Sequence, residues 1–222
     1  MLALGCRNSS TPPHAAKRVP APTPTRKSGV ARAALQSATR APIPALAPIL
    51  DSAITLPQAL KGENAPEDIR RAQRLINVRY YSFDSKLHEG QVLIHKDLAD
   101  DLRQIFQEIE ASHFPVAKVV PIERYGWSDD ASVKADNTSG FNYRKVPATH
   151  RFSAHAQGRA IDLNPWENPY MDPIRGTKQT YNPKVTGTLT ATSAPVKIFR
   201  KHGWTWGGVW RRGRDYQHFE KL

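Results

Sequence analysis

The clearest pattern of apolar positions lies between residues 97 and 112. Apolar side chains recur there every three or four residues, at Leu98, Leu102, Ile105, Phe106 and Ile109. This spacing places them on a single stripe of an α-helix. We therefore expect a helix over residues 97–112 that packs its apolar stripe against the core.

Shorter runs rich in β-branched and aromatic residues predict strands. The runs lie at residues 75–81, 91–95, 116–122, 204–206 and 216–219. The connection between the first two contains Asp84 and Gly90 and is expected to be a loop. Residues 159–163 also alternate between apolar and polar side chains, as a strand does.

Capping signals predict two shorter helices. Residues 64–68 read Asn-Ala-Pro-Glu-Asp, and acidic residues in a first turn complement the positive end of a helix dipole. This helix would continue to Ile76. A second helix is expected to open at Ser193, with Pro195 in its first turn, and to close at Gly203.

These elements show no regular alternation of strand and helix, which argues against a doubly wound parallel sheet. The predicted fold class is α+β, with a small antiparallel sheet and flanking helices. The first acidic residue is Asp51 and the first aromatic residue is Tyr80. We therefore expect one folded domain over residues 51–222, preceded by a tail over residues 1–50.

Composition separates this tail from the rest of the chain. The net charge is +12, and residues 1–48 carry seven lysines and arginines, no acidic residue and eight of the 18 prolines. Such a segment buries too little apolar surface to offset its chain entropy, so we expect it to be disordered and extended. It could be a solvated linker or could bind an anionic cell envelope. No groove-reading motif accompanies it, so nucleic acid is not an expected partner.

The single cysteine, Cys6, excludes an intramolecular disulfide bond. It follows Leu-Ala-Leu-Gly and resembles the end of a bacterial lipoprotein signal, in which a small residue precedes a lipidated cysteine. A complete signal has about 7–15 apolar residues before that point, whereas five residues precede Cys6. Cys6 is therefore either the lipid anchor of a truncated signal, and the expected contact with a membrane, or an ordinary residue.

Candidate chemistry is concentrated near the C-terminal end. Residues 153–165 carry His155 and Asp162 on either side of Gly158, and His218 follows later. A hairpin-like turn at Gly158, or a helix with positions i and i+7 on one face, would bring the first two side chains together. Two histidines and one carboxylate are the protein ligands of a catalytic zinc site, which keeps a fourth position open for water.

The string Ser-x-His-x-x-Gly-x-Ala-x-Asp-x-Asn at residues 153–164 resembles the zinc D-alanyl-D-alanine carboxypeptidase family. That family also contains the L-alanyl-D-glutamate endopeptidases of phage endolysins. Further segments resemble this endolysin-type branch and follow the family order over residues 55–222. They are residues 80–84, 95–97, 129–132, 137–144 and 204–210.

The resemblance implies a zinc cofactor at the sheet, with His155, Asp162 and His218 as its ligands. It also implies Asp215 as the general base, which would take a proton from zinc-activated water. Glu220 is a rival base, because strand alternation would place it on the same face as His218. Spacing alone does not decide between the two carboxylates.

Two more residues take roles from the resemblance. Arg144 matches an arginine that steadies the anionic intermediate or binds a substrate carboxylate, so it is both a catalytic and a substrate-binding candidate. Ser153 would help to orient the substrate, and its alternative is a hydroxyl that stabilises a local turn.

The aromatic residues near these motifs have two interpretations. Trp204, Trp206 and Trp210 would either line a substrate groove or pack in the core. Trp166 and Tyr170, directly after the metal motif, have the same alternatives.

The resemblance implies a monomeric, extracytoplasmic peptidase that hydrolyses an amide bond in peptidoglycan stem peptides. An L-Ala–D-Glu endopeptidase and a D-Ala-D-Ala carboxypeptidase are both compatible with the motifs. The alternative function is a non-catalytic wall-binding module of the same fold. Such a module would be expected to lack a ligand or the base, and the four residues His155, Asp162, Asp215 and His218 are all present.

Overall fold

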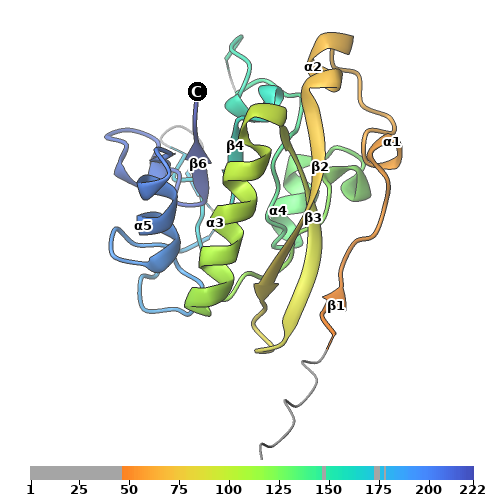
Figure 1. Ribbon diagram of the computed structural model, residues 1–222. Coiled ribbons are helices and arrows are strands. Elements are labelled where there is room, and N and C mark those ends of the chain that lie inside the picture. The colour runs from red at the N-terminus through yellow and green to blue at the C-terminus, as the bar shows by residue number, and fades with distance from the viewer. Residues whose placement is uncertain (1–46, 147–148, 173–175, 178) are drawn as a thin grey trace, which may run out of the picture. The chain divides into compact units, whose positions relative to one another are not determined.

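The computed structural model describes residues 47–146, 149–172, 176–177 and 179–222 (Figure 1). The described residues from 47 to 222 belong to one compact unit. Most of the predicted tail, with Cys6, lies outside the described residues. Within the described part of the chain, the helices are all too short or too polar to cross a membrane.

Among the described residues the strands form two three-stranded sheets, so the single antiparallel sheet expected from the sequence is wrong in number. The first sheet has the order β1-β3-β2 and the second the order β4-β6-β5. The strands are β1 (Ile49–Leu50), β2 (Gln73–Tyr81), β3 (Leu87–His95), β4 (Ala160–Asp162), β5 (Thr205–Trp206) and β6 (His218–Glu220). The second sheet is antiparallel throughout, whereas β1 runs parallel to β3 in the first.

Helices flank these sheets, and the α+β class predicted from the sequence is confirmed. The α-helices are α1 (Leu56–Ala59), α2 (Glu67–Ala72), α3 (Ala99–Ser112), α4 (Asp129–Lys134) and α5 (Ala194–Lys201). Short 3-10 helices are η1 (Lys96–Leu98), η2 (Ile122–Tyr125), η3 (Ala154–Gln157) and η4 (Gly207–Val209). The predicted apolar stripe of α3 is buried, and α3 packs against both β2 and α5 (Figure 1).

Two predicted boundaries change for identifiable reasons. The helix expected to reach Ile76 ends at Ala72, because β2 begins at Gln73, a fully buried residue whose side-chain amide donates to the carbonyl of Ile69. Gly90 lies inside β3 and not in a loop. A Cβ atom there would meet the carbonyl oxygen of Val119 at 2.0 Å, so this glycine lets another segment cross close to the sheet.

That crossing segment is residues 116–122, for which the sequence wrongly predicted a strand. Its apolar side chains are buried, but its backbone is held by single contacts and not by a ladder. The Tyr80 hydroxyl accepts from the amide of Val119 at 3.0 Å. The Asn137 side chain accepts from the amide of Val120 and donates to its carbonyl, at 2.9 and 3.0 Å. The β-branched composition therefore reflects burial here.

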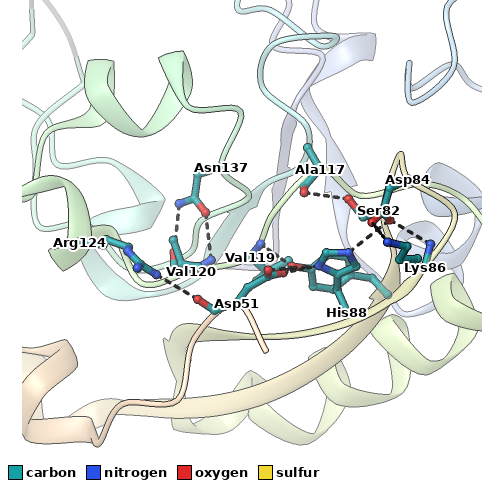
Figure 2. Close-up of polar contacts among 11 residues, drawn as sticks. Asp51, Ser82, Asp84, Lys86, His88, Ala117, Val119, Val120, Arg124 and Asn137 are labelled. Carbon is teal, nitrogen blue, oxygen red and sulfur yellow. Dashed lines mark hydrogen bonds and ion pairs between the residues drawn. The ribbon is translucent and has the colours of Figure 1, made fainter. Parts of the chain in front are cut away.

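A polar cluster holds β1 to the first sheet (Figure 2). The carboxylate of Asp51 accepts from the hydroxyl of Tyr80 and lies 3.0 Å from Nδ1 of His88. The other ring nitrogen of His88 is 3.3 Å from Asp84, and Arg124 donates to the carbonyl of Asp51 at 3.0 Å. β1 itself comprises Ile49–Leu50, which the sequence analysis had assigned to the tail.

A second charged cluster ties the end of α5 to α3. His202 follows α5, and its two ring nitrogens lie 2.6 Å from Asp101 and 2.9 Å from Glu108, both on α3. The hydrogen bond to Glu108 comes first among the interactions that raise the pKa of His202, and burial opposes them. Protonated His202 therefore stabilises the packing of α5 on α3.

This cluster predicts how stability depends on pH. Because the folded-state pKa of His202 is raised, its stabilisation is complete below the unfolded-state value of about 6.5 and is lost as pH rises through the folded-state value. We expect His202→Gln to lower the free energy of unfolding at pH 6 by about 1.5–3 kcal/mol and to have a smaller effect at pH 9. Urea denaturation at several pH values measures this, with the exposed His150→Gln as the matched control. An equal loss at both pH values would contradict the prediction.

Candidate metal centre

Local structure brings the three predicted ligands together. His155 lies in η3, where the Ser153 hydroxyl accepts from the amide of His155 at 3.3 Å. Gly158, with φ of 65°, ends this short helix and lets the chain turn back into β4. The predicted turn at Gly158 is thus the end of a 3-10 helix and not a β-hairpin. β4 carries Asp162, which pairs directly with His218 of the antiparallel strand β6.

The ligand atoms of this group face one another. Nε2 of His155 lies 3.1 Å from Asp162 and 3.2 Å from Nδ1 of His218, and that Nδ1 lies 3.1 Å from Asp162. All three residues are buried, and their candidate ligand atoms lie within 4.8 Å of one another. The group can therefore hold a metal ion.

The outward-facing nitrogens decide which ring atoms are free to bind the ion. Nδ1 of His155 lies 2.6 Å from the carbonyl of Gly140, so it carries the proton and leaves Nε2 with a lone pair. Nε2 of His218 lies 3.1 Å from the carboxylate of Glu220, which leaves Nδ1 to face the centre. Such partners on the far side of the rings are typical of metal-binding histidines.

The electrostatics of the group also favour a cation. Burial alone would raise the pKa of Asp162, but the adjacent imidazoles hold it well below its usual range. Burial lowers the pKa of His218, and its hydrogen bonds to Asp162 and Glu220 outweigh this and raise it to about 10. The buried carboxylate thus draws positive charge into the centre, and a metal ion between two imidazole nitrogens satisfies that demand.

A cavity of about 420 Å³ opens beside the centre. All six residues that the sequence analysis assigned to the site line it. They are Arg144, Ser153, His155, Asp162, Asp215 and His218. The fold therefore brings together side chains that are up to 74 positions apart in the sequence (218 − 144).

Asp215 lies at the edge of the turn that precedes β6. Its amide donates to the carbonyl of Gly207 at 3.2 Å, and a Cβ atom on Gly207 would meet the carbonyl of Asp215 at 2.6 Å. The Oδ1 atom is buried without a hydrogen-bond partner in the described part of the chain. Burial and, second, the charge of Asp162 raise the pKa of Asp215 to about 7. This carboxylate is therefore suited to accept a proton near neutral pH.

Arg144 and Ser153 line the cavity with partners of their own. Nε of Arg144 lies 3.0 Å from the carboxylate of Asp129 at the start of α4, and this ion pair keeps the guanidinium beside the cavity. Ser153 caps η3, so the turn-stabilising role considered for its hydroxyl is present in the structure. Both side chains also border the cavity, where a substrate would meet them.

The aromatic residues divide between the two interpretations. Trp204 and Trp206 are buried in the core, with 2% and 4% of their surface exposed. Trp210 lines the cavity beside the candidate metal centre, with its ring centroid 5.3 Å from that of His218. Tyr170 lines the same cavity. Trp166 is half exposed and borders a neighbouring cavity.

Several residues of the cavity wall carry no signal in the sequence. Asp129 lies in a segment that shares the resemblance but has no role implied by it, and no sequence pattern points to Arg151, Arg212 or Gln217. The carbonyl of Gly140 is a backbone group that no side-chain pattern reveals. Arginines that border a metal-binding cavity add positive potential for an anionic substrate.

One comparison with known proteins matches part of the chain to a family model. A family model described as D-alanyl-D-alanine carboxypeptidase matches residues 147–221. This segment contains His155, Asp162, Asp215 and His218, so the match supports a peptidase of this broad family. Neither the curated proteins nor the solved structures contain a match to the chain.

The outward-facing contacts of the histidines predict a graded loss of metal affinity. We expect His155→Gln and Asp162→Asn to abolish tight zinc binding, because each removes a ligand. Glu220→Gln should weaken zinc binding about 10–100-fold, because it frees the far nitrogen of His218. Asp215→Asn is the matched control and should change affinity much less. Titration against a fluorescent zinc chelator measures these affinities, and equal losses in the last two variants would contradict the assignment.

Proposed function

We propose that this protein is a zinc metallopeptidase that hydrolyses an amide bond in the stem peptides of peptidoglycan. The observation that carries the proposal is the position of Asp215 in one cavity with the His155, Asp162 and His218 centre. The family match over residues 147–221 supports the same class of reaction. Two imidazole nitrogens and one carboxylate leave an open position, as catalytic zinc sites do.

Zinc bound at this centre would lower the pKa of a bound water molecule toward about 7 and polarise a carbonyl group. Asp215 is the proposed general base, since its pKa is raised to about 7 and its Oδ1 lacks a partner among the described residues. It would accept the proton of the attacking water and later pass it to the leaving amine. Glu220 is assigned to holding the His218 ring, because it contacts the nitrogen that faces away from the centre.

Arg144 is proposed to stabilise the negative charge that develops on the substrate oxygen, or to bind a substrate carboxylate. Its ion pair with Asp129 holds the guanidinium at the cavity wall before substrate arrives. A preorganised donor of this kind contributes about 2.7–4 kcal/mol to lowering a barrier. Ser153, at the same wall, is proposed to orient the substrate.

Within this proposal the bond that is cut is either the D-Ala-D-Ala bond or the L-Ala–D-Glu bond of the endolysin-type branch. The substrate places the protein outside the cytoplasm, in the cell envelope or periplasm, where it would act as a monomer. The basic tail would favour the anionic envelope, and Cys6 would be the lipid anchor if the sequence retains part of a lipoprotein signal.

The first prediction of this function concerns the base. Asp215→Asn should keep zinc bound yet lose about 10²–10⁴-fold in kcat, because the amide cannot take the proton. Glu220→Gln should lose far less turnover once it is saturated with zinc. Steady-state hydrolysis assays on zinc-loaded proteins compare the two variants. A larger loss of kcat in Glu220→Gln than in Asp215→Asn would make Glu220 the general base and leave Asp215 without that role.

A second prediction concerns the reaction itself. Zinc-loaded protein incubated with defined muropeptides should give products that mass spectrometry resolves, and chelation should abolish their formation. Loss of a terminal D-alanine identifies a carboxypeptidase, whereas a new L-alanine carboxyl group and D-glutamate amine identify an endopeptidase. Binding without cleavage would instead indicate a wall-binding module, and activity that persists without metal would contradict the metallopeptidase.

A further inference from the structure

His155 differs from the other two candidate ligands in how the fold holds it. Asp162 and His218 lie on paired strands of the second sheet, whereas His155 lies in η3, a 3-10 helix of four residues. The hydrogen-bond geometry of a 3-10 helix is poorer than that of an α-helix, so a short one is held mainly by its surroundings. The position of the His155 ring therefore depends on what η3 and its flanking segments contact.

The first of these contacts fixes the acceptor of the His155 ring. The carbonyl of Leu93, in β3, accepts from the amide of Phe141 at 2.8 Å. Phe141 follows Gly140, and the Gly140 carbonyl lies 2.6 Å from Nδ1 of His155. A Cβ atom on Gly140 would meet the carbonyl oxygen of Leu93 at 2.2 Å, so this segment lies directly against the first sheet.

A second contact with the first sheet holds the turn that follows His155. The amide of His95, the last residue of β3, donates to the carbonyl of Gly158 at 2.8 Å. Gln73, the first residue of β2, is the partner of His95 in the antiparallel ladder. The end of this strand pair therefore lies against the turn at Gly158.

The side chain of Gln73 occupies the space between the strand end and this turn, and it is fully buried. Its Nε2 donates to the carbonyl of Ile69 at 2.9 Å and, in a longer bond of 3.4 Å, to the carbonyl of Gln157. Its Oε1 lies 2.1 Å from the position that a Cβ atom on Gly158 would take. Because residue 158 is a glycine, the amide group of Gln73 can lie directly against both residues of the turn.

This side chain has two sets of neighbours, and they separate two roles. The bond to Ile69 serves α2, because Gln73 directly follows the last residue of that helix. The contacts with Gln157 and Gly158 serve η3. Oε1 has no hydrogen-bond partner in the described part of the chain, which is a cost that an apolar side chain at this position would avoid.

We propose that Gln73 is a positioning residue for the metal centre, and that it acts through Gln157 and Gly158 on the ring of His155. Gln73 itself does not line the cavity beside the centre. Without its amide group, η3 could shift against the end of β3, and the His155 ring would be held less firmly opposite the other two ligands. The inference rests on the metal-binding part of the proposed function and not on the reaction.

The test compares Gln73→Met with Gln91→Met in the full chain. Methionine is close to glutamine in length and volume and lacks the amide group. Gln91 is the matched control, since it is 6% exposed, lies on β3 and bonds to Ser52, Ile54 and Asn77 and not to η3. Both variants should lower the free energy of unfolding in urea, because each loses buried hydrogen bonds.

Only Gln73→Met should change the metal centre. We expect it to weaken zinc binding about tenfold, the lower end of the loss that follows removal of a ligand's own hydrogen-bond partner. Titration against a fluorescent zinc chelator measures the affinity. The visible absorption spectrum of the cobalt-substituted protein, which reports ligand geometry, should change in Gln73→Met and stay as in the wild type in Gln91→Met.

Two results would overturn the role of Gln73. The first is wild-type zinc affinity together with a wild-type cobalt spectrum in Gln73→Met. The second is an equal loss of zinc affinity in Gln73→Met and Gln91→Met, which would assign the effect to the general stability of the first sheet.

Amide hydrogen exchange, followed by NMR in the full chain without added metal, separates this inference from the proposed function. The amides of His95 and Gly158 report the turn directly, because one donates to the Gly158 carbonyl and the other to the His155 carbonyl. Gln73→Met should speed their exchange about tenfold more than Gln91→Met does. If the wild type bound no zinc, the metallopeptidase proposal would fail, and this exchange would still decide whether Gln73 holds the turn. Equal rates in the two variants would overturn the positioning role.

Discussion

The pairing of Asp162 with His218 across β4 and β6 is the contact on which the candidate site depends. These strands are only three residues long, yet their register places a carboxylate and an imidazole side by side and within 3.1 Å. A shift of one residue in the pairing of β4 with β6 would place the two side chains on opposite faces of the sheet, and the three candidate ligands would no longer lie together. The core beneath, with Phe219 and Ile161 fully buried, holds that register in place.

Burying this much charge is costly, and the surrounding contacts explain how the fold tolerates it. The outward-facing nitrogen of each imidazole lies at hydrogen-bond distance from an acceptor. The acceptor is the carbonyl of Gly140 for His155 and the carboxylate of Glu220 for His218. These contacts hold the rings in place before an ion binds. Binding therefore costs less conformational entropy than it would with mobile side chains. The buried carboxylate of Asp162 favours positive charge beside it, which is why the pKa of His218 is raised and why a cation suits the centre.

The elements that the sequence predicted well are those with a strong local signal. The spacing of apolar residues predicts the buried stripe of α3. Pro195 and Gly203 predict where α5 begins and ends. The resemblance carried by residues 153–164 and 215–220 implies His155, Asp162 and His218 as ligands, and the fold brings these three side chains together. A strand was wrongly predicted over residues 116–122, because β-branched side chains fit any buried segment, and this one crosses close to the sheet at Gly90 without forming a ladder. The neighbouring cavity that Trp166 borders was not predicted, because its wall combines α4, residues 165–170 and Gln217, which only the tertiary fold brings together.

The attachment of β1 has a mechanical meaning. A pulling force applied to the chain at residue 47 acts first on Ile49–Leu50. It then acts on the contacts of Asp51 with Tyr80 and His88. Those contacts belong to the first sheet, whereas two of the three candidate metal ligands lie on the second. A pull on the chain from that side would peel away β1 and break the Asp51 contacts before it disturbed the ligand geometry. The polar cluster of Figure 2 would then act as a sacrificial link.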